Sequence, residues 1–104
     1  MRFLVIGLGS MGKRRIRNLI ALGHSEISGW DNREDRRKES SHKYKIKTFN
    51  SFDETVKLFK PDAFLISVNP DKHMEYAYYA YERNIHCFIE ASVTEAEKIM
   101  KLSV

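Results

Sequence analysis

The sequence predicts an α/β fold, in which a single domain is built on a doubly wound parallel sheet of about five strands. Short apolar runs alternate with amphipathic stretches along the chain. This alternation calls for a parallel sheet with helices on both faces. The length of 104 residues suits one domain. The 42% hydrophobic and 31% charged residues are the balance of a soluble globular protein.

The apolar runs are the expected strands. Residues 2–6 form a strand that ends at a glycine-rich loop, and residues 63–68 are the most apolar run. Residues 44–49 alternate polar and apolar side chains, which favours a strand nearer the sheet edge. The expected strands are residues 2–6, 26–31, 44–49, 63–68 and 85–90.

Helices are expected between and after these strands. The first has apolar residues at helical spacing and is stopped by Gly23. The third begins with a capping-box pattern from Ser51 to Glu54. The second is polar and only weakly amphipathic. The expected helices are residues 11–23, 32–42, 51–59, 73–83 and 94–102.

Several classes of protein do not fit the sequence. No apolar run approaches the roughly 20 residues that span a bilayer, and the N-terminus does not resemble a secretory signal. Cys87 is the single cysteine, so no internal disulfide is expected and a reducing compartment fits. The histidines and Cys87 lack zinc-type spacing. We therefore expect a cytoplasmic protein with no metal site and no membrane partner.

The net charge of +4 comes mainly from basic residues between positions 13 and 47. Such a patch favours an anionic partner. A nucleic acid is one candidate, but the sequence has no helix-turn-helix, zinc-finger or RNA-binding signature. We therefore expect a nucleotide rather than a nucleic acid.

The glycine-rich loop has the spacing of a dinucleotide-binding motif between a strand and a helix. Gly7 permits the tight turn, Gly9 lets the backbone approach a pyrophosphate, and Gly12 lets the helix pack on the strand. The helix N-terminus then offers free N–H groups to the phosphates. The predicted cofactor-binding residues of this Rossmann-like loop are Gly7, Leu8, Gly9, Ser10, Met11 and Gly12.

An acid follows at the end of the next expected strand. Asp31 stands 19 residues after Gly12, where dinucleotide folds place a carboxylate on the ribose hydroxyls. This acid favours NAD, because a carboxylate repels the 2′-phosphate of NADP. Arg33, with Arg36 and Arg37 close by, leaves NADP open, since an arginine here can pair with that phosphate. A solvated helix face is the simpler interpretation of these arginines.

The chain resembles the Gfo/Idh/MocA oxidoreductases over residues 2–103. The resemblance rests on the glycine loop, on Asp31, on the run from Ser67 to His73 and on Phe88-Ile89-Glu90. It implies a dinucleotide cofactor, with Glu90 near the nicotinamide ribose. The residues that it places beside the nicotinamide half of the cofactor are Ser67, Val68, Asn69 and His73. The alternative for His73 is that it only caps a helix start.

The sequence departs from the family pattern at two points. The usual Thr-Pro-Asn-x-x-His is Val68-Asn69-Pro70-x-x-His here. The usual Glu-Lys-Pro is Glu90-Ala91-Ser92, and an alanine cannot transfer the proton that the family's lysine handles. The family's second domain, which forms the substrate pocket, is not in these residues. We therefore predict no catalytic residue.

Two hypotheses about function stay open at this point. The first is that residues 1–104 are the dinucleotide-binding domain of an oxidoreductase for a sugar, polyol or nucleotide sugar, truncated and inactive alone. The second is a stand-alone, non-catalytic module that binds a dinucleotide or regulates a partner. In either case the strand with Cys87, Phe88 and Ile89 would be an unprotected sheet edge. We therefore expect self-association into a homo-oligomer.

Overall fold

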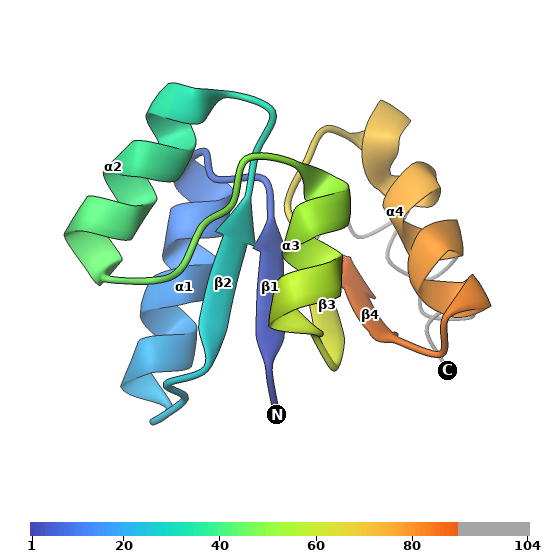
Figure 1. Cartoon of the computed structure of the whole chain (residues 1–104), viewed down its shortest axis with the longest axis horizontal. Helices are drawn as coiled ribbons and strands as arrows, with labels where there is room; N and C mark the ends of the chain where they lie inside the picture. Colours follow the sequence, from blue (N-terminus) through green and yellow to red (C-terminus); the bar gives the residue numbers. More distant parts are fainter. Residues whose placement is uncertain (90–104) are drawn as a thin grey trace.

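A computed structural model describes residues 1–89 of the chain, and Figure 1 shows strands and helices in a layered arrangement. Each strand has four residues, and the helices have between 8 and 13. In chain order the elements of the described part are β1 (Phe3–Ile6), α1 (Ser10–Ala21), β2 (Ile27–Trp30), α2 (Glu34–Tyr44), α3 (Phe52–Phe59), β3 (Ala63–Ile66), α4 (Pro70–Glu82) and β4 (His86–Ile89).

The sheet is parallel throughout and has the strand order β2-β1-β3-β4. The chain leaves β1 for β2 on one side and later crosses to β3 on the other. The order therefore reverses at β1, and ligands bind outside the carboxyl ends of the strands at such a point. In the register, Ile6 lies between Trp30 and Ile66. The residues that follow these three strands therefore emerge side by side at one edge.

Helices cover both faces of the sheet (Figure 1). On β1, Phe3 and Val5 belong to one core cluster, which also contains Ile16 of α1. The alternate residues of β1 belong to the second cluster, in which Phe64 packs with Ala80 of α4. The two clusters follow from the period-2 alternation of a strand that is buried on both sides. The α/β class and the parallel sheet that the sequence predicts are confirmed.

The predicted strand over residues 44–49 is wrong in its extent. α2 continues to Tyr44, and Lys45 takes a left-handed conformation with φ of 55°, which ends the helix and prevents an extended run. Only one isolated parallel bridge forms, between Ser28 and Lys47. The alternating pattern arises because Ile46 is buried in the core while its neighbours are not. The described part of the sheet therefore has four strands instead of about five.

β4 lies at one end of the strand order. Cys87 points into the core, and burial raises the pKa of its thiol to about 11, so the thiol stays protonated at neutral pH. Phe88 points outward and is 58% exposed. Glu90 and the helix predicted over residues 94–102 lie outside the described residues.

Candidate functional site

The loop between β1 and α1 turns where only glycine fits. Gly7 has a φ of +96°, and a Cβ atom on it would lie 2.7 Å from the carbonyl oxygen of Ser67. Its N–H donates to the Trp30 carbonyl at 2.8 Å. Gly7, at the end of β1, is therefore in direct contact with the ends of both neighbouring strands, β2 and β3.

Gly12 sets the position of α1 against this loop. A Cβ atom on Gly12 would lie 1.7 Å from the carbonyl oxygen of Gly7, so the helix backbone packs directly on the turn. α1 starts at Ser10, and its N-cap residue is Gly9, which has no side chain to accept a hydrogen bond from the first turn. The N–H groups of this turn are therefore available to an anion, and the helix dipole favours negative charge there.

Asp31 is held beside the glycine loop by two backbone donors. Its Oδ2 accepts from the Leu8 N–H at 2.9 Å, and its Oδ1 accepts from the Arg33 N–H at 2.9 Å. The residue is only 9% exposed. The carboxylate at the end of β2 is thereby fixed next to the N-terminus of α1, with lone pairs left for a ligand.

The three arginines after Asp31 have different partners. Arg33 forms a two-point hydrogen bond with Asp35 at 2.7 and 3.1 Å, which raises the pKa of Arg33 and lowers that of Asp35. Arg37 donates to the Asp31 carbonyl at 2.8 Å and lies 4.9 Å from the centre of the Trp30 ring. Arg36 has only a loose ion pair at 3.5 Å with the Asp31 carboxylate among the contacts of the described residues.

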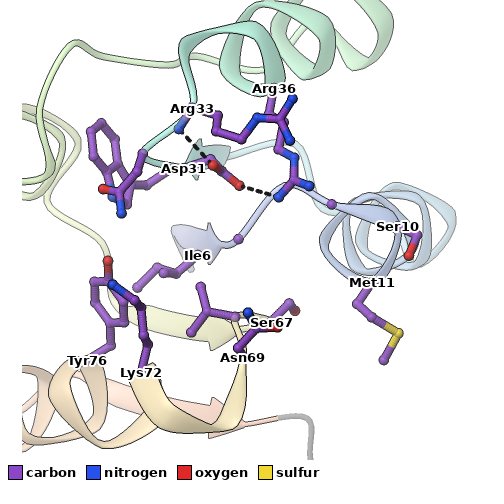
Figure 2. A pocket seen from close by; sticks show the side chains of 15 residues that line it. Ile6, Ser10, Met11, Asp31, Arg33, Arg36, Ser67, Asn69, Lys72 and Tyr76 are labelled. Atoms are coloured by element: carbon purple, nitrogen blue, oxygen red, sulfur yellow. Dashed lines mark hydrogen bonds and ion pairs between the residues drawn. The ribbon is translucent and has the colours of Figure 1, made fainter.

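The opposite wall of the site comes from the loop between β3 and α4. Ser67 donates its N–H to the Ile6 carbonyl at 2.7 Å, and its buried hydroxyl has no hydrogen-bond partner within the described structure. Lys72 and Tyr76 stand one turn apart on α4 and face the same hollow (Figure 2). Burial raises the pKa of the Tyr76 hydroxyl, and a hydrogen bond with Trp30 opposes part of that shift.

His73 does not line this hollow. It is 3% exposed, and its Nε2 lies 2.6 Å from the Val68 carbonyl oxygen. Because a carbonyl only accepts, Nε2 carries the proton. His73 therefore links α4 to the loop at Val68 without itself lining the cavity.

These walls enclose an open cavity of about 420 Å³ (Figure 2). Its lining includes most of the residues predicted from the sequence, namely Gly7, Gly9, Ser10, Met11, Asp31, Arg33, Ser67, Val68 and Asn69. Leu8, Gly12 and His73 do not line the cavity, but each contacts a residue that does: Asp31, Gly7 and Val68 respectively. The structure does not describe Glu90.

Six lining residues are not among the predicted site residues, although the sequence points to Arg36 as one of the arginines that can pair with a 2′-phosphate: Ile6, Trp30, Asn32, Arg36, Lys72 and Tyr76. Two signals were available for some of them. Trp30 and Asn32 flank the predicted acid, so they share its position at the end of the strand. Lys72 and Tyr76 lie four residues apart, a spacing that puts both on one helix face.

Residues 1–89 contain neither a candidate membrane span nor a candidate metal centre. No helix there is long and apolar enough to cross a membrane. No group of three or more His, Cys, Asp or Glu side chains there is arranged to hold a metal ion.

A glycine turn, an uncapped helix N-terminus and a tethered acid on the neighbouring strand together define a dinucleotide-binding α/β domain. The chain belongs to the Gfo/Idh/MocA family, because the family model described as "Oxidoreductase family, NAD-binding Rossmann fold" matches residues 1–103. The recognition made from the sequence is thus confirmed. No curated protein sequence matches the chain.

Solved structures show the same fold. UDP-N-acetylglucosamine 3-dehydrogenase GnnA from Acidithiobacillus ferrooxidans is 25% identical with a TM-score of 0.78, and the match covers 98% of this chain and 34% of that one. A probable dehydrogenase from Thermotoga maritima is 24% identical with a TM-score of 0.79, covering 99% and 32%. GenD2 from gentamicin A biosynthesis, in complex with NAD, is 14% identical with a TM-score of 0.79, covering 99% and 31%. The chain thus spans about a third of the length of these structures.

The packing of Gly12 predicts a large difference between two alanine substitutions in the loop. Gly12→Ala should lower the free energy of unfolding by about 3 kcal/mol or more, because its methyl group would collide with a backbone oxygen that cannot move away cheaply. Gly9→Ala is the matched control. The atoms nearest to its methyl group would be those of the Arg36 guanidinium, at an ordinary 3.5 Å or more. Urea unfolding followed by circular dichroism measures both, and equal stabilities would contradict the packing argument.

Proposed function

We propose that this chain is the cofactor domain of an oxidoreductase that acts on a sugar, a polyol or a nucleotide sugar, and that NAD is its preferred dinucleotide. The observation that carries the proposal is the Asp31 carboxylate, which the Leu8 and Arg33 N–H groups hold beside the uncapped start of α1. Family membership supports the oxidoreductase class. GnnA and the myo-inositol 2-dehydrogenase from Lactobacillus plantarum, by their descriptions, act on substrates of the proposed kind.

The residues of the cavity suit the parts of a dinucleotide. The first N–H groups of α1, at Ser10 and Met11, would receive the pyrophosphate, and the absent side chain of Gly9 leaves room for it. Asp31 would accept hydrogen bonds from the adenosine ribose. By family resemblance the nicotinamide half would lie against Ser67, Val68, Asn69 and the undescribed Glu90. When bound, the cofactor supplies the hydride-transfer chemistry, and this domain binds and orients it.

The carboxylate of Asp31 should be needed for NAD binding. In Asp31→Asn one oxygen is replaced by an NH₂ group, which cannot accept from the Leu8 or Arg33 N–H or from a ribose hydroxyl. We expect NAD⁺ affinity to fall by about tenfold, which corresponds to roughly 1.4 kcal/mol. Quenching of Trp30, the single tryptophan and part of the cavity wall, measures binding.

The matched control for that substitution is Glu34→Gln, which removes the same charge from an exposed ion pair with Lys38. It should bind NAD⁺ as the wild type does. Wild-type protein that binds neither NAD⁺ nor NADP⁺ would refute the proposed function. Equal losses in the two variants would refute the role of Asp31.

We propose that the chain by itself binds the cofactor without turning over a substrate, with the substrate-binding part of the enzyme outside residues 1–104. The alanine at position 91, where the family has lysine, supports this. Incubation with NAD⁺ or NADP⁺ and a panel of cyclic polyols, sugars and nucleotide sugars should produce no absorbance at the reduced-nicotinamide band. Turnover above a protein-free control would contradict this expectation.

We further propose that copies of the chain associate through the edge strand β4, where Phe88 is 58% exposed. Light scattering at high concentration should give twice the 12.2 kDa mass of one chain. Phe88→Glu should restore the single-chain mass. Tyr81→Glu, at an exposed aromatic residue on α4, should not. A monomeric wild type would contradict the proposal.

A further inference from the structure

A groove lies at the opposite end of the sheet from the dinucleotide site, where β1 and β2 begin. Figure 1 shows the N-terminus at this end. The groove has a volume of about 480 Å³, which falls within the range of small-molecule sites. None of the residues that line it also lines the dinucleotide site, so the two can be occupied together. The lining of this amino-end groove includes Arg2, Glu26, Lys45, Lys47, Leu58 and Phe59.

Part of the amino-end groove is apolar. Phe49 and Phe59 are partly buried there, and Leu58, beside Phe59 at the end of α3, is 61% exposed. A single exposed leucine is common on protein surfaces. This one adjoins two aromatic rings of the same groove, so the apolar ring of a ligand would shield these side chains from water.

The rest of the lining is mainly basic. Three positive side chains line the groove, against the one acid Glu26. Lys45 and Lys47 form no ion pair within residues 1–89. The groove therefore joins an apolar surface to an excess of positive charge, which is the complement of an anion with an apolar body.

Arg2 is fixed on one side of its guanidinium and available on the other. Its Nε donates to the Lys60 carbonyl at 2.8 Å, and its backbone N–H donates to the Asp62 carboxylate at 2.7 Å. Nη1 and Nη2 take no part in these hydrogen bonds, and the side chain is 42% exposed. An arginine held in this way can bind an oxyanion through the N–H groups that remain.

The ends of helices account for only part of this positive charge. Lys45 is the C-cap residue of α2, where a positive charge interacts favourably with the helix dipole. Arg2 contacts the C-cap carbonyl of α3, but only through Nε. Lys47 lies outside the helices and has no such role. Its positive charge and the terminal nitrogens of Arg2 are therefore free to serve a ligand of the groove.

We propose that the amino-end groove binds a small organic anion, in which a phosphate or a carboxylate is attached to an apolar ring. The oxyanion binds the terminal nitrogens of Arg2 and the lysines, and the ring lies against Leu58 and Phe59. Glu26 disfavours ligands that carry a second negative group on the ring. This site is separate from the proposed cofactor function and does not depend on it.

The experiment titrates ¹⁵N-labelled protein with four probes and follows the backbone amides by NMR. Phenyl phosphate carries both features, and benzoate has a carboxylate in place of the phosphate. Benzyl alcohol has the ring without the charge, and inorganic phosphate has the charge without the ring. The amides of Ile27 and Phe49 report the amino-end groove, whereas those of Gly9 and Ser10 report the dinucleotide site.

Three variants test the residues. Arg2→Lys keeps the positive charge but removes the two terminal nitrogens, and Lys47→Gln removes one charge from the groove. Lys57→Gln is the matched control, because it removes the same charge from an exposed position in the last turn of α3 that does not line the groove. Lys47→Gln leaves the contacts of Arg2 with Lys60 and Asp62 intact, so it tests the site even if Arg2→Lys disturbs the fold.

We expect phenyl phosphate to shift Ile27 and Phe49 of the wild type with a dissociation constant of about 1 mM or below, and to do so equally with NAD⁺ present. Benzyl alcohol and inorganic phosphate should each bind about tenfold more weakly, because each lacks half of the contact. Lys47→Gln should weaken phenyl phosphate by about threefold and Arg2→Lys by about tenfold. Lys57→Gln should bind as the wild type does. Benzoate that shifts the same amides supports carboxylate ligands, and benzoate that does not supports phosphates alone.

Three results would overturn the inference. Shifts at Gly9 and Ser10 alone would place the anion in the dinucleotide site. Equal affinities for phenyl phosphate and inorganic phosphate, or for phenyl phosphate and benzyl alcohol, would show that charge or ring alone is recognised. Equal losses in Lys47→Gln and Lys57→Gln would reduce the effect to net charge. Binding of NAD⁺ is followed separately at Gly9 and Ser10, so failure of the proposed function is distinguishable from each of these results.

Discussion

The close approach of three backbone segments at Gly7 is the constraint on which the site depends. The Ser67 carbonyl oxygen would lie 2.7 Å from a Cβ on Gly7, and the Gly7 carbonyl oxygen would lie 1.7 Å from a Cβ on Gly12. These contacts bring the end of β3 and the first turn of α1 to the end of β1. Backbone packing thus creates the cavity and aims a helix N-terminus into it before any side chain contributes.

The basic residues near the cavity fall into two groups: some pair with acids on a neighbouring helix, and others face the cavity. Lys13 of α1 pairs with Glu39 of α2, so part of the basic character of the N-terminal half joins helices instead of facing a ligand. An ion pair whose carboxylate is half exposed contributes little to stability. Arg36 remains directed at the cavity, beside the tethered Asp31. The net charge of the chain therefore overstates the positive charge that a bound anion would meet.

The sequence was enough to predict the fold class, the glycine loop and Asp31, because each follows from local rules of spacing and strand alternation. The strand predicted at residues 44–49 was wrong because Tyr44 and Ile46 alternate with lysines and both pack against the core, whereas the left-handed Lys45 between them breaks the extension. The different roles of the three arginines after Asp31 could not be predicted from the sequence either. Three similar residues within five positions differ only in partners that the folded chain supplies, such as Asp35 for Arg33.

His73 matches the family motif but does not line the cavity, so a residue of the motif need not contact the ligand. The Nε2–H of His73 binds the Val68 carbonyl, so it fixes the shape of the loop that carries Ser67 and Asn69 into the cavity. This also explains why the exchanged order of Asn69 and Pro70 fits. Proline is favoured in the first turn of a helix, where its missing N–H costs nothing, and α4 begins at Pro70 with Asn69 as its N-cap residue. The loop of this chain therefore accommodates a proline in the first turn of α4 while His73 holds the Val68 carbonyl.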